Sequence, residues 1–183
     1  MTTKQSVAIL FVCSANLCRS VTAAEFARRA AGPLTAGSVR WRFASAGVHV
    51  IPGQRLPART DSTMRDLGIP VHHRPRLVDD ASVRTADLIL TAERTHRATI
   101  VERFPFAVRS TYTLLQFARL VEAGRAVAGD DLGLTRIAQI GQANVQALED
   151  DTIDIADPVT GDTAAAMLHC ADLIDAAIQQ IIR

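Results

Sequence analysis

The sequence of 183 residues has few cysteines, few aromatic residues and almost no net charge. It has three cysteines, an odd number, which disfavours a disulfide-stabilised scaffold and fits a reducing cytoplasm better. A formal net charge of +1 gives no general case for binding nucleic acid or an anionic membrane. No apolar run approaches the roughly 20 residues of a spanning helix, and the N-terminus lacks the apolar stretch and cleavage site of a secretory signal.

Apolar runs alternate with helical periodicity along the first two thirds of the chain. The continuous apolar run over 7–12 is typical of a strand buried on both faces. Further strands are expected over 42–46, 86–92 and 108–114, and helices over 23–30, 61–67 and 93–104. This alternation predicts an α/β fold with a mostly parallel sheet covered on both sides.

The last third of the chain has a different pattern. One apolar helical stripe covers 134–148, a polar stretch follows over 149–162, and a regular apolar face over 167–181 predicts a final helix. We found no repeat and no convincing linker, so the expectation is one domain over 1–183.

Cys13 follows the first predicted strand directly and opens a short loop before a helix. Cysteine is a nucleophile as the thiolate, and a free thiol with a pKa of about 8.5 is mostly protonated at neutral pH. At a strand-to-helix turn, unpaired backbone N–H groups converge on a nest that would stabilise a thiolate or a bound phosphate. Arg19 would close the loop with a planar guanidinium that can hold two phosphate oxygens, and the Ser20 hydroxyl could cap the helix or donate to the sulfur. The alternative to a catalytic loop is that Cys13 is simply a small buried residue at the end of a strand and Arg19 a solvated residue of the first helical turn.

The run Phe11-Val12-Cys13-Ser14-Ala15-Asn16-Leu17-Cys18-Arg19-Ser20 resembles the signature of the low-molecular-weight protein tyrosine phosphatases. The similarity continues in the same order through Ser45-Ala46-Gly47, Pro57-Ala58-Arg59, His73-Arg74-Pro75-Arg76, Ala86-Asp87-Leu88-Ile89-Leu90 and Asp157-Pro158-Val159-Thr160-Gly161. It covers most of the chain outside roughly 119–150, where an added helical segment precedes the last helix.

The resemblance implies a doubly wound parallel sheet of four strands and a role for each residue of the loop. Cys13 would be the nucleophile, Arg19 the phosphate clamp, and Ser20 the hydroxyl that helps the sulfur leave. Asn16 and Ser45 would hold the shape of the loop. The residues expected to cradle the phosphate are Ser14, Ala15, Asn16, Leu17, Cys18 and Arg19.

A leaving oxygen needs a proton, and the loop itself contains no acid. Asp157 is the candidate, because Pro158 fixes the backbone after it and the resemblance gives it this role; the alternative is a simple Asp-Pro turn. Asp154 is the rival acid and is expected to be solvated.

The remaining cysteines and histidines point to structure rather than to a metal. Cys18 is open to two interpretations, a reversible disulfide with Cys13, as the family resemblance suggests, or a small residue packed under the loop. Cys170 is expected to be buried on the last helix. His72 and His73 could tether loops by hydrogen bonds, and no histidine has the spacing of metal ligands, so no metal or other cofactor is expected.

The sequence departs from the family pattern where a phosphotyrosine ring would bind. Familiar members carry an aromatic residue after Ser-Ala-Gly and often tyrosines after Asp-Pro, whereas this chain has Val48-His49-Val50-Ile51-Pro52 and Val159-Thr160. The expected substrate is therefore a phosphorylated protein, with phosphotyrosine as the favoured target, or a small phosphate ester, and the product is inorganic phosphate.

Two other functions stay open. An arsenate reductase would use the same loop but needs further cysteines as a relay, and a phosphate-binding module without turnover would need only the cradle. The sequence does not indicate an oligomeric state. The segment 119–150 could cover the active-site mouth or form a partner surface, and the alternative is a packed accessory helix.

Overall fold

The computed structural model describes residues 5–32, 39–70, 73–128 and 153–182. The apolar stripe expected over 134–148 and most of the added segment over 119–150 lie outside these residues, as does His72.

Four parallel strands form one sheet in the order β2-β1-β3-β4. The strands are β1 Gln5–Cys13, β2 Val39–Gly47, β3 Leu88–Thr91 and β4 Thr111–Thr113. This confirms the α/β fold with a four-stranded parallel sheet. Because β1 has a strand on each side, its Ile9–Val12 stretch is buried on both faces, as its continuous apolar sequence predicts.

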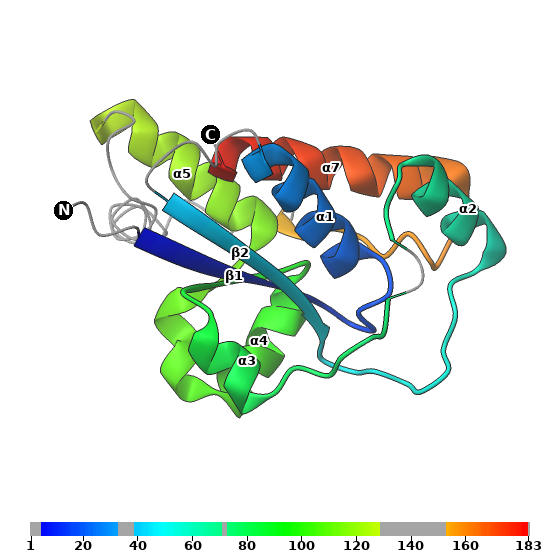
Figure 1. The fold of residues 1–183 in the computed structure, drawn as a ribbon, viewed down its shortest axis with the longest axis horizontal. Coiled ribbons are helices and arrows are strands. Elements are labelled where there is room, and N and C mark those ends of the chain that lie inside the picture. Colours follow the sequence, from blue (N-terminus) through cyan, green and yellow to red (C-terminus); the bar gives the residue numbers. More distant parts are fainter. Residues whose placement is uncertain (1–4, 33–38, 71–72, 129–152, 183) are drawn as a thin grey trace.

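Helices cover the sheet on both faces (Figure 1). They are α1 Arg19–Ala31, α2 Ala58–Asp66, α3 Asp80–Thr85, α4 Arg94–Arg103, α5 Leu114–Ala128 and α7 Ala164–Ile182. Ile9 and Phe11 point to the core shared with α1, α5 and α7, whereas Leu10 and Val12 point to the core on the side of α3 and α4. The alternation of side chains along β1 thus joins two cores through one strand.

Two elements differ from the sequence prediction. The fourth strand was expected over 108–114, but Pro105–Ser110 forms a 3-10 helix, the strand is only Thr111–Thr113, and Leu114 already begins α5. Pro105 is the first residue of that 3-10 helix, where its fixed φ favours the turn and its missing N–H costs nothing. Helix α3 was not predicted at all.

Helix α7 is long and apolar enough, by length and composition alone, to cross a membrane, and it is the one such helix among the described residues. Its apolar face packs inside the protein, where Met167, Cys170, Ile174 and Ile178 are almost fully buried. We therefore assign α7 to the core.

Gly47 ends β2 directly beneath the loop that follows β1. A Cβ at this position would lie 2.5 Å from the Ser14 carbonyl oxygen and 2.9 Å from the Asn16 nitrogen. The backbone on both sides is fixed, since Val48 N donates to the Cys13 oxygen and His49 N to the Ser14 oxygen, each at 2.9 Å. Only glycine lets β2 approach the loop this closely.

We expect Gly47→Ala to lower the free energy of unfolding by about 1–3 kcal/mol, because the added methyl group overpacks the backbone of the loop. Gly32→Ala is the matched control, since its Cβ would have no neighbour within 4 Å and its φ of −52° is helical. Urea unfolding followed by circular dichroism measures both variants. Equal midpoints for the two would contradict the role assigned to Gly47.

Candidate functional site

The loop after β1 leaves backbone donors free beside a cysteine. Cys13 is the last residue of β1 and is 3% exposed, and α1 begins six residues later at Arg19. The N–H groups of residues 15–18 donate no hydrogen bond within the described part of the chain. The loop therefore offers the N–H groups and the helix N-terminus that an anion prefers.

Asn16 holds the loop in shape. It is fully buried and adopts a left-handed conformation, with a φ of 54° that few residues other than glycine and asparagine tolerate. Its Nδ2 donates to the hydroxyls of Ser20 and Ser45, both at 3.0 Å, and its Oδ1 accepts from the Arg76 backbone N–H at 2.9 Å. The Asn16 carbonyl accepts from His73 Nε2 at 2.6 Å, so this histidine tethers the loop as the sequence predicted.

Ser20 lies against the sulfur of Cys13. Its Oγ is 3.1 Å from Cys13 Sγ and accepts from Asn16 Nδ2. Because the amide already donates to Oγ, the hydroxyl hydrogen is left to donate to the sulfur. The geometry suits stabilisation of a thiolate on Cys13.

Arg19 is 3% exposed, and its guanidinium donates to four oxygens, one of which is the Ser14 hydroxyl at 3.3 Å from Nη2. Its Nη1 donates to Glu93 Oε1 and, at 2.9 Å, to the Ile155 carbonyl, while Nη2 lies 2.9 Å from Asp157 Oδ2. Burial alone would lower the pKa of Arg19, but Asp157, Cys13 and Glu93 outweigh it and raise this pKa above its ordinary value. The guanidinium is therefore a fixed cation at the loop.

Asp157 reaches the loop because its segment is attached to the end of β3. Ile155 N donates to the Ala92 oxygen at 2.9 Å, which carries the following residues toward Cys13. The Asp157 side chain is 38% exposed, and its Oδ1 accepts from Val159 N at 3.1 Å. Asp154, expected to be solvated, is instead paired with Arg94, whose N and Nε lie 2.8 and 3.0 Å from its carboxylate oxygens.

Glu93 and His96 belong to the same site and were not predicted from the sequence. Glu93 pairs with Arg19, and His96 Nε2 lies 2.8 Å from the hydroxyl of Ser14, which also accepts from Arg19 Nη2 at 3.3 Å. Both residues follow β3, the strand that lies parallel to β1 and next to it. The ends of neighbouring parallel strands meet at one edge of the sheet, and this position was the available signal.

Cys18 points away from the loop into the protein. Its Sγ lies 3.3 Å from Met167 Sδ on α7, and both residues are buried. The neighbouring thiol of Cys170, together with burial, raises the pKa of Cys18 above the ordinary range. Cys170 is buried as expected, and all three cysteines are free thiols in this structure.

A small cavity of about 50 Å³ opens beside Cys13, Arg19 and Asp157. The rest of its lining comes from the loop and from the segments around Pro57 and Val159: Ala15, Leu17, Cys18, Gln54, Arg55, Leu56, Pro57 and Val159. None of these residues is aromatic. Among the residues that the structure describes, no group of three His, Cys, Asp or Glu side chains is arranged to hold a metal ion.

Two histidines, the buried His96 and the half-buried His73, make the stability of the site depend on pH. Burial lowers the pKa of both His73 and His96 below the ordinary 6.5, and the Arg76 and Arg19 charges respectively add to this effect. The folded state thus favours the neutral imidazoles, and below pH 6.5 the unfolded chain binds more protons. Their contribution to stability is complete above that pH and decreases as the pH falls.

We expect the double variant His73→Gln, His96→Gln to lose less stability than the unsubstituted protein between about pH 7.5 and about pH 5.5, because neither imidazole is left to protonate. Melting temperatures across this range measure the effect. The exposed His169→Gln is the control and should keep the original slope. A double variant with an unchanged slope would show that other groups cause the dependence.

Comparison with known proteins now identifies the family. The model of the family "low molecular weight phosphotyrosine protein phosphatase" matches residues 8–127, which excludes the segment around Asp157. A protein-arginine-phosphatase from Geobacillus stearothermophilus is 33% identical over 109 residues, which cover 60% of this chain and 70% of the relative.

Solved structures have the same fold over nearly the whole chain. The YwlE arginine phosphatase from Geobacillus stearothermophilus superposes with a TM-score of 0.64 at 26% identity and covers 96% of this chain and 90% of its own. A low-molecular-weight protein tyrosine phosphatase from T. tengcongensis has a TM-score of 0.68 at 21% identity and covers 96% and 97%. The chain belongs to the low-molecular-weight phosphotyrosine protein phosphatase family and is a phosphatase of the phosphoric monoester hydrolase class.

Proposed function

We propose that the protein hydrolyses phosphotyrosine in protein substrates through a phosphocysteine intermediate on Cys13. The observation that carries this proposal is the convergence of Cys13, Arg19 and Asp157 at one small cavity, with the Ser20 hydroxyl against the sulfur. Cys13 Sγ lies 3.1 Å from Ser20 Oγ, and Arg19 Nη2 lies 2.9 Å from Asp157 Oδ2, with all three charged or nucleophilic groups lining the cavity. A thiolate, a cation and a carboxyl group are what transfer to sulfur requires.

In the first step, the Cys13 thiolate attacks phosphorus and forms an S–P bond. The P–O bond to the tyrosine oxygen breaks, and that oxygen takes the proton of the Asp157 carboxyl group, so tyrosine leaves as a neutral phenol. The loop N–H groups and Arg19 stabilise the equatorial phosphate oxygens.

In the second step, water attacks phosphorus while Asp157 takes a proton from it. The S–P bond breaks, inorganic phosphate leaves, and the electron pair returns to Cys13 as a thiolate. Ser20 donates its hydroxyl hydrogen to this sulfur, because Asn16 Nδ2 occupies the acceptor side of the same hydroxyl.

The ion pair between Arg19 and Asp157 has to open for this cycle to begin. With Nη2 on Asp157, one arm of the guanidinium is not available to the substrate. A phosphate dianion between Cys13 and Arg19 replaces the carboxylate, which then takes up the proton that it later transfers. Glu93 and the Ile155 carbonyl keep Nη1 in place during this exchange.

The cavity wall favours an aryl leaving group. Leu17, Leu56 and Val159 are half-buried apolar residues that can contact the ring of phosphotyrosine, in place of the aromatic walls of familiar members. Arg55 lines the same cavity and would repel the cationic guanidinium of phosphoarginine. Asp157 is the one carboxylate among the described residues of the lining, and it is already paired with Arg19.

Phosphoarginine is the second candidate substrate. The relatives from Geobacillus stearothermophilus are arginine phosphatases, and one is 33% identical to this chain. Both substrates would use the same phosphate cradle, so they differ only in the contacts of the leaving group.

The cytoplasm remains the proposed location of this activity. The nucleophile has to stay reduced, and the three cysteines are free thiols. We also propose that 1–183 acts as one domain.

Initial rates on matched peptides that carry phosphotyrosine or phosphoarginine test the proposal. We expect kcat/KM to be at least about 10-fold higher for phosphotyrosine, a ratio within reach of one apolar pocket, and Cys13→Ser to abolish both activities. Arg55→Gln should narrow the ratio by improving phosphoarginine hydrolysis, whereas the exposed Arg59→Gln, outside the cavity, should not.

Three results would change the proposal. Faster hydrolysis of phosphoarginine would reverse the order of the two substrates. Phosphate binding without hydrolysis of either peptide would indicate a binding module. Full activity of Cys13→Ser would overturn the phosphocysteine intermediate.

A further inference from the structure

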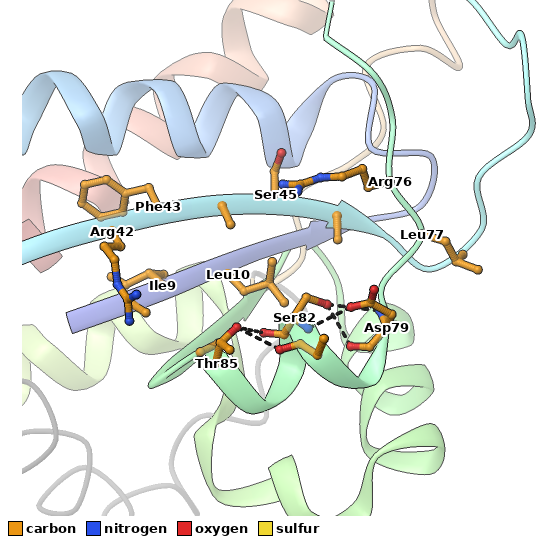
Figure 2. Close-up of a pocket in the computed structure, with 15 residues that line it drawn as sticks. Ile9, Leu10, Arg42, Phe43, Ser45, Arg76, Leu77, Asp79, Ser82 and Thr85 are labelled. Carbon is orange, nitrogen blue, oxygen red and sulfur yellow. Dashed lines mark hydrogen bonds between the residues drawn. The ribbon is translucent and has the colours of Figure 1, made fainter. Parts of the chain in front are cut away.

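Two larger cavities lie beside β2, an edge strand of the sheet, and neither is the cavity at Cys13. One has a volume of about 440 Å³ and lies toward α3 (Figure 2). Its lining includes Arg42 and Arg76, but it also includes the carboxylate of Asp79, which disfavours an anion there. Ser82 and Thr85 already donate their hydroxyls to backbone oxygens at the start of α3 and within it. The other has a volume of about 340 Å³ and lies beside α1 and the back of the Cys13 loop.

We propose that the 340 Å³ cavity binds a small phosphorylated anion at a site separate from the catalytic face of the loop. Its lining includes the guanidinium-bearing residues Arg28, Arg74 and Arg76 together with His73, and none of the described residues that line it is acidic. Its volume is in the range of small-molecule sites and suits a compact ligand such as pyrophosphate or a phosphorylated metabolite.

Two of the three arginines carry positive charge that no ion pair of the described residues neutralises. These are Arg74 and Arg76, although Arg76 also acts on Asp79. Hydrogen bonds from Ser82 lower the pKa of this carboxylate, and the charge of Arg76 adds to the effect. The third, Arg28, has its Nη1 3.4 Å from Glu25 Oε2. Figure 2 shows the Arg76 side chain lying beside Ser45, on the other side of β2 from Arg42. Guanidinium groups bind phosphate oxygens in pairs, so a dianion is the ligand that this charge selects.

His73 has a buried ring nitrogen without a partner. Its Nε2 contacts the carbonyl oxygen of Asn16, which can only accept, so Nε2 carries the proton in the neutral ring. Its Nδ1 is buried and makes no hydrogen bond among the described residues. An unpaired buried nitrogen costs free energy, and an anion held beside the ring by the neighbouring arginines would favour its protonated form through the anion's charge.

The same residues support the catalytic loop from behind. His73 contacts the Asn16 carbonyl, and the Arg76 backbone N–H donates to Asn16 Oδ1. Ser45 and Asn16, which the cavity shares with the loop, are hydrogen-bonded to each other at 3.0 Å. An anion in this cavity would therefore lie against Asn16, a residue of the loop. Its binding does not depend on the proposed reaction.

Imidazole NMR of the whole protein during a titration with pyrophosphate tests this site. His73 reports on the cavity, and His96, next to Ser14, reports on any binding at the catalytic loop. We expect the His73 signal to shift and saturate in the unsubstituted protein. In the double variant Arg74→Gln, Arg76→Gln, the pyrophosphate concentration that half-saturates the His73 shift should rise at least about 10-fold, because a charge-assisted contact is lost. Any shift of the His96 signal should be the same as in the unsubstituted protein.

The control variant Arg40→Gln, Arg42→Gln removes the same charge from exposed positions outside the cavity and should bind as the unsubstituted protein does. Thermal melting checks that each variant is folded, and the single variants Arg74→Gln and Arg76→Gln replace the double one if it is not. A His73 signal that does not shift would overturn the proposal. So would a shift that chloride of equal ionic strength reproduces, or one that persists unchanged in the Arg74 and Arg76 variants.

Discussion

The arrangement of the site depends on the side-chain amide of Asn16. It is buried in a left-handed conformation, and its two donors and one acceptor connect the loop to Ser20 on α1, Ser45 on β2 and the backbone of Arg76. An unsatisfied buried amide would cost roughly 1–3 kcal/mol, so the four segments are held in one arrangement. The direction of the Ser20 hydroxyl toward the sulfur, and therefore the stabilisation of a thiolate, follows from this amide.

Arg19 connects separate segments of the site through its charge, as Asn16 does through its amide. A buried guanidinium is stable only beside carboxylates, and Glu93 and Asp157 supply them from two separate segments. The two carboxylates have different surroundings. The side chain of Glu93 is 25% exposed, whereas that of Asp157 is 38% exposed and accepts a hydrogen bond only from the nearby Val159 N–H besides Arg19, among the described residues. This difference fits a fixed partner in Glu93 and an exchangeable one in Asp157.

Much of the fold and the loop could be predicted from the sequence, because continuous apolar runs mark the buried strands and the Cys13–Ser20 run is local. Helix α3 was missed because it has six residues and buries only Val83, which leaves no periodic stripe to detect. Glu93 and His96 were missed because their contacts with Arg19 and Ser14 cross 74 and 82 positions of the chain and exist only once β3 lies beside β1. The basic cavity behind the loop likewise combines residues of α1 with the segment that carries His73 and Arg76.

The central claim is that the phosphoryl group passes through the sulfur of Cys13. Asp157→Ala should slow the hydrolysis of the intermediate, because no other carboxylate of the described residues lines the cavity to take a proton from water. Rapid mixing of this variant with p-nitrophenyl phosphate, followed by quenching and peptide mass spectrometry, measures where the phosphoryl group resides. The account predicts one phosphoryl group on the peptide that contains Cys13, released as the reaction ages. Continued turnover with phosphoryl on another residue, or on none, would contradict it.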